Sequence, residues 1–157
     1  MSPKAIFMET TAIPASKTMG QIGEVLMRAG ARRIVQDYND SGSATAVSFT
    51  LLVNEMPVSY QLPARLEPVY NLLRSKRKGY VTDSDQTKIR AQSERVAWRQ
   101  VLRWVEAQVA MVQTGMVAAN EVFLPYVVDR TGKTLYQHFV EGGFKMLAAP
   151  AESEAQG

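Results

Sequence analysis

The sequence predicts an α+β domain in which helices cover a mainly antiparallel meander sheet of about four strands. Three observations lead to this fold class. Up to Pro63, short segments with strand-like composition are separated by turn-forming residues and interrupted by one helical segment. After Pro63, apolar residues recur at intervals of three and four, which is typical of helices. Strands that precede the helices, instead of alternating with them, favour an antiparallel sheet.

The first elements are a strand and a helix. Residues 5–13 predict a strand that Pro14 closes. Ser16 is a suitable N-cap for a helix that runs to about Ala29, because apolar residues then recur on one face. Gly30 supplies the C-terminal stop.

Three further strands are expected to form a meander. Residues 31–38 and 44–53 flank a segment dense in turn formers, and in the second of them apolar and small residues alternate, as in a sheet with one buried face. Residues 58–62 alternate in the same way. Pro57 lacks a backbone N–H and therefore marks this last strand as an edge of the sheet.

Helices follow Pro63. The first carries Leu66, Val69, Tyr70 and Leu73 on one face. Asp83 to Asp85 offer caps for a second, very long helix, which we expect to run from about Asp85 to Leu124. The segment "TLYQHFVEGGF" predicts a last short helix, preceded by a turn in "DRTGKT". One domain over residues 1–147 and a disordered tail over residues 148–157 complete the expected organisation.

The long helix is apolar on more than one side, which a helix that covers only its own sheet does not require. Forty residues would form a rod of roughly 60 Å, longer than the diameter of about 40 Å expected for this domain. Either the overhang packs against another subunit, or Gly115 breaks the helix into a hairpin-like pair. The oligomer interface predicted by the first alternative consists of Leu102, Val105, Val109, Val112 and Met116.

Basic residues concentrate in one stretch. From Arg74 to Arg103 there are nine Lys or Arg and three Asp or Glu, although the net charge of the chain is only +3. Several cations on one surface are what a phosphate backbone requires. The alternative is a set of solvated helix faces on which Arg stems cover apolar neighbours. The candidate nucleic-acid contacts are Arg74, Lys76, Arg77, Lys78, Lys88 and Arg90, a ridge of Arg95, Arg99 and Arg103, and Tyr80 as a stacking platform.

Composition and spacing argue against catalysis and metal binding. The chain has no cysteine and one histidine, which excludes thiolate sites and an imidazole-rich metal site within one subunit. "TGKT" resembles the end of a P-loop, but Val127 stands where the motif requires glycine. Asp37 and Asp40 flank a turn, and His138 has no nucleophile or acid partner at local spacing. We expect no catalytic residue, metal or cofactor; a site assembled from distant residues remains the alternative.

No segment has the pattern of a signal peptide or the length of a membrane span, so we expect a soluble, cytoplasmic protein. Three motifs carry a resemblance over about residues 10–139. The segments "TTAIPASKT", "SFTLLVNEMPVSYQLP" and "RVAWRQVLRWVEAQ", the last followed by "FLPY", resemble a pattern in uncharacterised phage and prophage proteins. The resemblance implies a phage context in a bacterial host, and an early or accessory role that handles nucleic acid or blunts host defences.

The sequence therefore predicts a non-enzymatic, self-associating protein that binds nucleic acid, with a preference for single-stranded DNA or RNA. The order of strands and a long helix also loosely resembles single-strand-binding folds of the Whirly type, although the strand count differs. The alternative is a phage inhibitor or adaptor that docks a host or phage protein through its long helix. The third hypothesis is an enzyme with a dispersed site.

Overall fold

The structure is a computed structural model that describes residues 4–144, Leu147 and Ala149. All of the predicted tail except Ala149 lies outside these residues. The elements are α1 (Ala15–Arg28), β1 (Arg33–Tyr38), β2 (Ala44–Val53), β3 (Met56–Pro63), α2 (Leu66–Ser75), α3 (Asp83–Gln113), α4 (Ala119–Val122), the 3₁₀ helix η1 (Leu124–Tyr126) and α5 (Leu135–Gly142).

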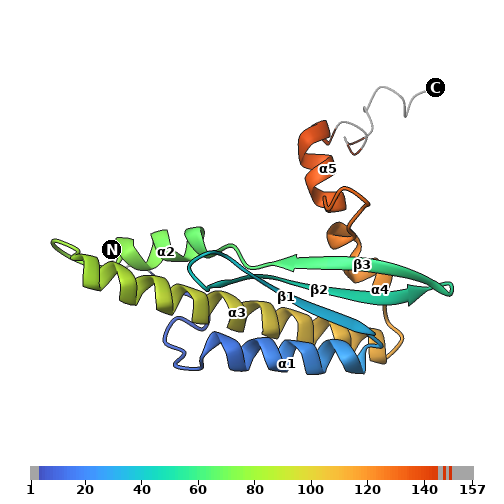
Figure 1. Cartoon of the computed structure of the whole chain (residues 1–157), viewed down its shortest axis with the longest axis horizontal. Helices are drawn as coiled ribbons and strands as arrows, with labels where there is room; N and C mark the ends of the chain where they lie inside the picture. Colours follow the sequence, from blue (N-terminus) through green and yellow to red (C-terminus); the bar gives the residue numbers. More distant parts are fainter. Residues whose placement is uncertain (1–3, 145–146, 148, 150–157) are drawn as a thin grey trace.

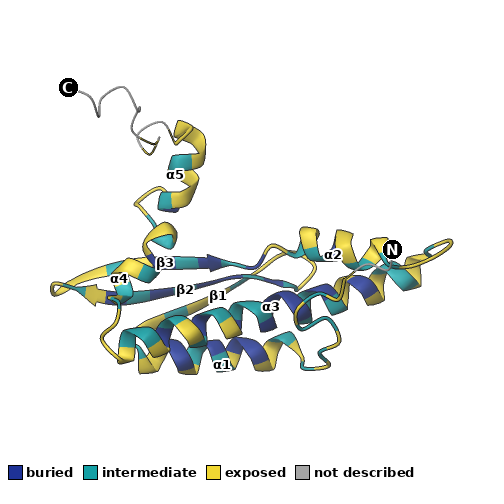
Figure 2. Cartoon of the chain, turned by 180° about the vertical axis from the view of Figure 1, so that it is seen from behind, coloured by how far each residue is buried: buried dark blue, intermediate teal, exposed yellow. Residues whose placement is uncertain are grey.

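The α+β class is confirmed, with a sheet of three antiparallel strands in the order β1-β2-β3. Helices α1 and α3 lie side by side against one face of the sheet, and α2 packs along α3 (Figure 1). The register pairs Phe49 with Ile34 on one side and with Tyr60 on the other. The rings of Phe49 and Tyr60 stack with centroids 5.2 Å apart. The core lies between this face of the sheet and the two helices, as Figure 2 shows by burial.

The expected first strand is wrong, which leaves three strands where about four were predicted. Residues 7–10 form a turn and the rest of 5–13 has no regular structure; Met8 has a φ of 64°, and the Glu9 amide donates to the Ile6 carbonyl at 2.9 Å. The amide of Gln92 in α3 donates to the carbonyls of Glu9 and Thr11 at 2.8 and 2.9 Å. Side chains of α3 thus take backbone groups that a strand would offer to a neighbouring strand.

Helix α1 begins one residue earlier than its expected cap. Pro14, not Ser16, is the N-cap residue, and its carbonyl accepts the amides of Lys17 and Thr18 at 3.1 and 3.2 Å. Gly30 ends the helix as expected. Its φ of 97° is a left-handed conformation that favours glycine, and it lets the Ala31 amide reach the Leu26 carbonyl at 3.0 Å.

Helix α3 is long but ends eleven residues before the expected end at Leu124, at Gln113. Its 31 residues form a rod of about 46 Å. Gly115 has a φ of 77°, and the Met116 amide donates to the Met111 carbonyl at 3.0 Å, which closes the helix end. The chain then folds back, and Phe123 becomes fully buried. The break at Gly115 corresponds to the intrachain alternative.

The fold also changes the interpretation of the apolar seam on α3. Leu102, Val105 and Val109 are at most 3% exposed and belong to the core of the chain itself. Val112 is half-buried, and Met116 is exposed beyond the end of the helix. The second apolar side carries Trp104, whose ring meets Phe123 edge-on at 5.8 Å. The two-sided apolarity is therefore used within the chain, and most of the expected oligomer interface is not available to another subunit.

Candidate nucleic-acid interface

The turn between α2 and α3 forms one end of the molecule (Figure 1). Gly79 in this turn has a φ of 83°, a conformation that favours glycine. Thr82 then caps α3, because its hydroxyl accepts the Asp85 amide at 3.1 Å while the Asp85 carboxylate accepts the Thr82 amide at 3.1 Å. The backbone and side-chain hydrogen bonds from Thr82 lower the pKa of Asp85 below its ordinary value. The turn is thus held at the start of α3.

The basic residues at this end of the molecule come from three places. Two lie at the end of α2 or next to it, two lie in the turn and one lies in the first turns of α3. Tyr80 lies among them, and its side chain is 90% exposed. The five cations are Arg74, Lys76, Arg77, Lys78 and Lys88, which together with Tyr80 we call the basic turn.

Two of the five cations have carboxylate partners. Lys76 forms an ion pair with Glu9 and donates to the Lys4 carbonyl at 2.8 Å. The hydrogen bond from Lys76 holds the pKa of Glu9 below its ordinary value. Arg77 lies 3.4 Å from the Asp85 carboxylate. Lys76 contacts the N-terminal segment and Arg77 contacts the start of α3. Both cations are therefore less available to a ligand than the other three.

The remaining three cations are exposed. Within the part of the chain that the structure describes, Arg74, Lys78 and Lys88 form no ion pair. Arg74 lines a surface depression with Arg77 and Tyr80. Lys88 lines a neighbouring one, which Arg77 also borders. The two depressions therefore share Arg77, and the exposed ring of Tyr80 lines one of them together with Arg74.

Of the four cations farther along α3, two pair with carboxylates and two donate to neutral side-chain amides, and none lines the depressions of the basic turn. Arg90 pairs with Glu67 at 3.1 Å, and its guanidinium lies 4.1 Å from the centre of the Tyr70 ring. Arg103 pairs with Glu106 at 2.8 Å. The half-buried Arg95 donates from Nε to the Gln92 amide oxygen at 2.9 Å.

Arg99 requires the largest correction to the predicted site. Its side chain is only 3% exposed and donates to the Gln21 amide oxygen of α1 at 2.6 Å. Because an α-helix has 3.6 residues per turn, every fourth residue lies farther around the helix axis, so residues along the predicted ridge contact different neighbours. The expected ridge is interrupted at Arg99, which is buried and unable to reach a phosphate backbone.

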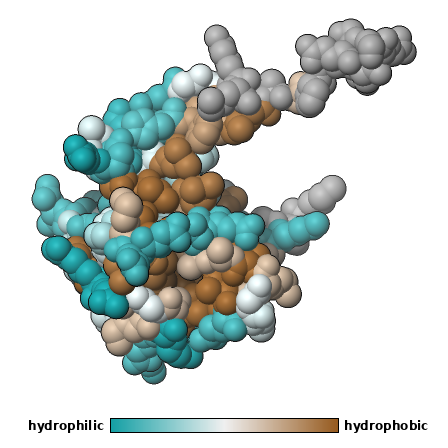
Figure 3. Space-filling model, turned by 90° about the vertical axis from the view of Figure 1, so that its right-hand side faces the viewer, coloured by the Kyte–Doolittle hydropathy of each residue, from teal (hydrophilic) through white to brown (hydrophobic). Residues whose placement is uncertain are grey.

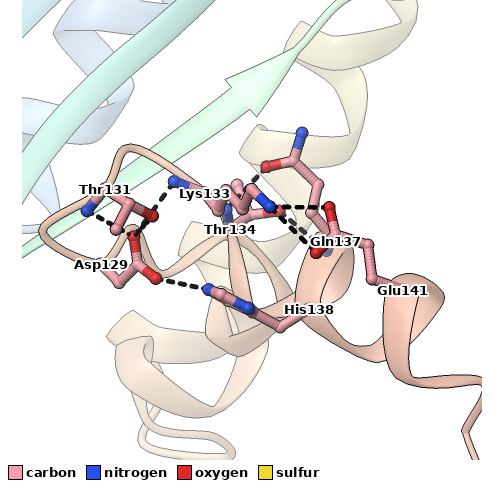
Figure 4. Close-up of polar contacts among 7 residues, drawn as sticks. All are labelled: Asp129, Thr131, Lys133, Thr134, Gln137, His138 and Glu141. Atoms are coloured by element: carbon pink, nitrogen blue, oxygen red, sulfur yellow. Dashed lines mark hydrogen bonds and ion pairs between the residues drawn. The ribbon is translucent and has the colours of Figure 1, made fainter.

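A second polar cluster, which the sequence reading did not assemble, lies before and on α5 (Figure 4). Asp129 accepts the Thr131 amide at 2.8 Å, the Thr131 hydroxyl at 2.6 Å and the Lys133 amide at 3.2 Å. Its other oxygen contacts Nε2 of His138. The Thr131 hydroxyl, followed by His138, holds the pKa of Asp129 far below its ordinary value. His138 thus has the acid partner that local spacing did not reveal.

This cluster stabilises a turn and a helix start. The Thr134 hydroxyl accepts a hydrogen bond from the backbone amide of Gln137 at 3.2 Å. The side-chain oxygen of Gln137 in turn accepts the backbone amide of Thr134 at 2.7 Å. Lys133 pairs with Glu141 across α5 at 2.9 Å. The turn and helix start predicted for "DRTGKT" are confirmed. The Thr131 hydroxyl donates to the carboxylate that contacts His138, so the contacts shown organise the turn and do not align a nucleophile with the imidazole.

Metal-binding geometry, membrane-spanning helices and similarity to known proteins give no further support for a function. Among residues 4–144, Leu147 and Ala149, no group of three or more His, Asp or Glu side chains is arranged to hold a metal ion. The helices of the described chain include none with the length and apolar character of a membrane span. Comparison of the chain with protein-family models, curated protein sequences and solved structures gives no significant match. The resemblance to phage proteins therefore stays a prediction.

Proposed function

We propose that this protein binds single-stranded nucleic acid, without catalysing a reaction, through the basic turn between α2 and α3. The observation that carries the proposal is a group of three exposed cations at the turn that carries the exposed ring of Tyr80. Arg74 lines the same depression as Tyr80, Lys88 lines the adjoining one, and Lys78 lies two residues before Tyr80 in the chain. None of these cations pairs with a carboxylate in the described part of the chain. The proposal is narrower than the one from the sequence, because it leaves out the four arginines farther along α3, which are Arg90, Arg95, Arg99 and Arg103.

The electrostatic part of the proposal follows from the behaviour of phosphate backbones. Cations that neutralise phosphates release counterions, so affinity falls as salt rises, with a logarithmic slope of about 0.7 per contact for single strands. Cations that already have carboxylate partners contribute less to this release. We therefore assign the main contacts to Arg74, Lys78 and Lys88, with Lys76 and Arg77 at the border of the site.

The preference for single strands rests on Tyr80. An exposed aromatic ring stacks on a base only when the face of that base is free, which a continuous duplex does not offer. The ring lies beside Gly79 in a turn at the end of the molecule, so a strand can approach it from solvent. Phosphates on either side of a stacked base would then lie near the cations of the basic turn.

Binding of a fluorescent oligothymidylate and its RNA counterpart, measured by anisotropy over a salt series, tests the proposal. Replacing Arg74, Lys78 and Lys88 together by Gln is expected to reduce the logarithmic salt slope by about 2. The control replaces three other exposed cations, Arg28, Arg32 and Arg130, by Gln. Equal losses in the two triple variants, or no binding by the unchanged protein at low salt, would overturn the proposal.

A further inference from the structure

The C-terminal part of the described chain forms an arm that stands away from the body of the molecule (Figure 1). The arm consists of residues 129–144 and contains α5, whose main packing contact among the described elements is η1. Its root is fixed to the sheet, because the Val128 amide donates to the Ser59 carbonyl at 2.9 Å and Tyr60 pairs with Val127. A helix of only eight residues is marginal in water unless its apolar side packs against something.

That apolar side is partly exposed in the described part of the chain. Tyr136, Val140 and Phe144 follow one another at intervals of four and are 42–50% exposed. The ring of Phe144 folds back to stack on Phe139, with centroids 5.9 Å apart. Figure 2 shows the arm as mostly exposed, and Figure 3 shows apolar residues continuing from the arm onto the body. Within residues 4–144, Leu147 and Ala149, no other element covers these three side chains fully.

An apolar groove lies on the body near the root of the arm. It has a volume of ≈ 280 Å³ and runs between the end of β3, α2 and α3. Tyr126 of η1 lines it, and no residue of α5 does in the described chain. Arg65 is its only charged lining residue, and its guanidinium lies 5.7 Å from the centre of the Tyr136 ring. The apolar lining is Leu62, Pro63, Ala64, Val69, Ala97, Val101, Trp104 and Tyr126.

We infer that the protein forms a symmetric dimer in which α5 of each copy docks in this groove of the other. Each copy carries both the exposed helix face and an apolar groove beside it. In a dimer with twofold symmetry, the helix face of each copy packs in the groove of the other, so both surfaces are buried in both copies. The fixed root at Val128 leaves the chain's own α5 beside the groove and not in it. This interface uses none of the α3 seam residues, and it is independent of the proposed nucleic-acid binding.

The charges and the area of the helix face and the groove are compatible with α5 of a second copy as the bound partner. The charged groups of α5 pair within the arm, as Lys133 does with Glu141 and His138 with Asp129, so docking brings few unpaired charges toward the groove. Arg65 can contact a partner's tyrosine ring as it contacts Tyr136. Each arm has three half-exposed apolar side chains. Together with the body surface that they would cover, and counted in both copies, they would bury on the order of 1,000 Å², which a specific interface requires.

The mass of the protein in solution tests the dimer. We expect sedimentation equilibrium to show a dimer at micromolar concentration, and Val140→Lys to raise its dissociation constant by about 100-fold or more, because the ammonium group would be buried in a groove whose charged lining residue, Arg65, is also positive. Val140 is half exposed in the single chain, so this variant should fold. Met27→Lys, at an exposed position on α1, is the control and should stay dimeric. A monomer at all accessible concentrations would overturn the inference.

Engineered cysteines identify the contacting surfaces, since the natural chain has none. The variant with both Val140→Cys and Val101→Cys should form a disulfide between copies, seen as a covalent dimer without reductant. The single variants should stay uncrosslinked under the same mild oxidation. Three outcomes would contradict the docking of α5 in the partner's groove: a disulfide within one chain, no disulfide, or crosslinking by Val140→Cys alone. Val140→Lys should still bind an oligonucleotide, so loss of the dimer and failure of the proposed function are distinguishable.

Discussion

Tyr80 is unusual among the aromatic side chains of this protein because it contributes almost nothing to the folded structure. Its side chain is 90% exposed, whereas Tyr60 and Trp98 are fully buried. The indole of Trp98 also donates to the Ala44 carbonyl at 3.1 Å, which satisfies its polar group inside the core. A ring without packing partners can be removed with little effect on stability, so Tyr80 permits a test of function alone.

We expect Tyr80→Ala to weaken binding of single-stranded oligonucleotides by about 1–3 kcal/mol, the range for loss of one stacked base. Tyr80→Phe should retain most of the affinity, because stacking uses the ring and not the hydroxyl. Titration by fluorescence anisotropy at fixed low salt measures both variants. Tyr38→Ala, which removes an exposed ring on β1, is the control. Unchanged affinity in Tyr80→Ala would show that the turn binds without stacking.

Individual arginines show how far burial differs between residues of one type. Arg74 is exposed on α2, while Arg99 lies under α1 with Gln21 as its partner. Both belong to the same basic stretch of the sequence. Which of them is free depends on the elements packed above each position, and α1 precedes Arg99 by some seventy residues in the chain.

At the scale of elements, the end of α3 determines how the C-terminal part of the chain returns to the core. Gly115 adopts a φ of 77°, and α4 with η1 then brings Phe123 against Phe49 at 5.2 Å. A continued helix would carry Phe123 away from the sheet. The glycine therefore directs the chain toward its own body and sets the point from which the arm departs.

Gly115→Ala is expected to destabilise the fold by about 1–2 kcal/mol, because a Cβ is strained in the left-handed conformation even though open space surrounds it. Gly20→Ala is the matched control. Gly20 lies inside α1 with nothing near the position of a Cβ, so the same change should stabilise by about 0.5–1 kcal/mol. Urea unfolding followed by circular dichroism measures both. A stabilising effect at Gly115 would contradict the assigned helix end.

At the scale of the whole molecule, the carboxylates with lowered pKa values join segments that are distant in the sequence or organise turns. Glu9 joins the N-terminal segment to the end of α2 through Lys76, Asp85 caps α3, and Asp129 organises the root of the arm. Each is favoured in its charged form by the contacts of the folded state. Their titration therefore links folding to pH.

We expect the free energy of unfolding to fall in acid. The unfolded chain takes up protons near the ordinary values of 4.5 for Glu9 and 3.8 for Asp85 and Asp129, while the folded chain binds them only at lower pH. The stabilisation is present above about pH 4.5 and is lost as the pH falls through the lowered pKa values. Urea midpoints between pH 7 and 2.5 measure it. Asp129→Asn should reduce this pH dependence, and a dependence equal to that of the unchanged protein would contradict the role of Asp129.

The two proposed surfaces are separate in the molecule. The basic turn forms one end, and the arm leaves the body well away from it (Figure 1). Variants in one surface should therefore leave the other intact, as their effects add when sites are distant. This separation makes the nucleic-acid proposal and the dimer testable one at a time.

Local features of the sequence were sufficient for most elements of the fold. Turn formers between residues 38 and 44 and the alternation of Val47, Phe49 and Leu51 predicted the meander, because both depend on residues close in the chain. The first predicted strand failed for the opposite reason. A strand exists only where a neighbouring strand accepts its hydrogen bonds, and Gln92 of α3 accommodates residues 9–11 instead.

The amino-acid sequence by itself determined that the chain forms an α+β fold with a long helix and that its positive charge is concentrated, since composition and periodicity fix both. Only the tertiary structure decided which cations are free. Glu9 reaches Lys76, Glu67 reaches Arg90 and Gln21 reaches Arg99 across long stretches of chain. Partners of this kind are brought together by packing, so spacing along the sequence carries no information about them. The exposure of the apolar side chains of α5 was likewise determined by tertiary packing, because it depends on which elements contact this helix.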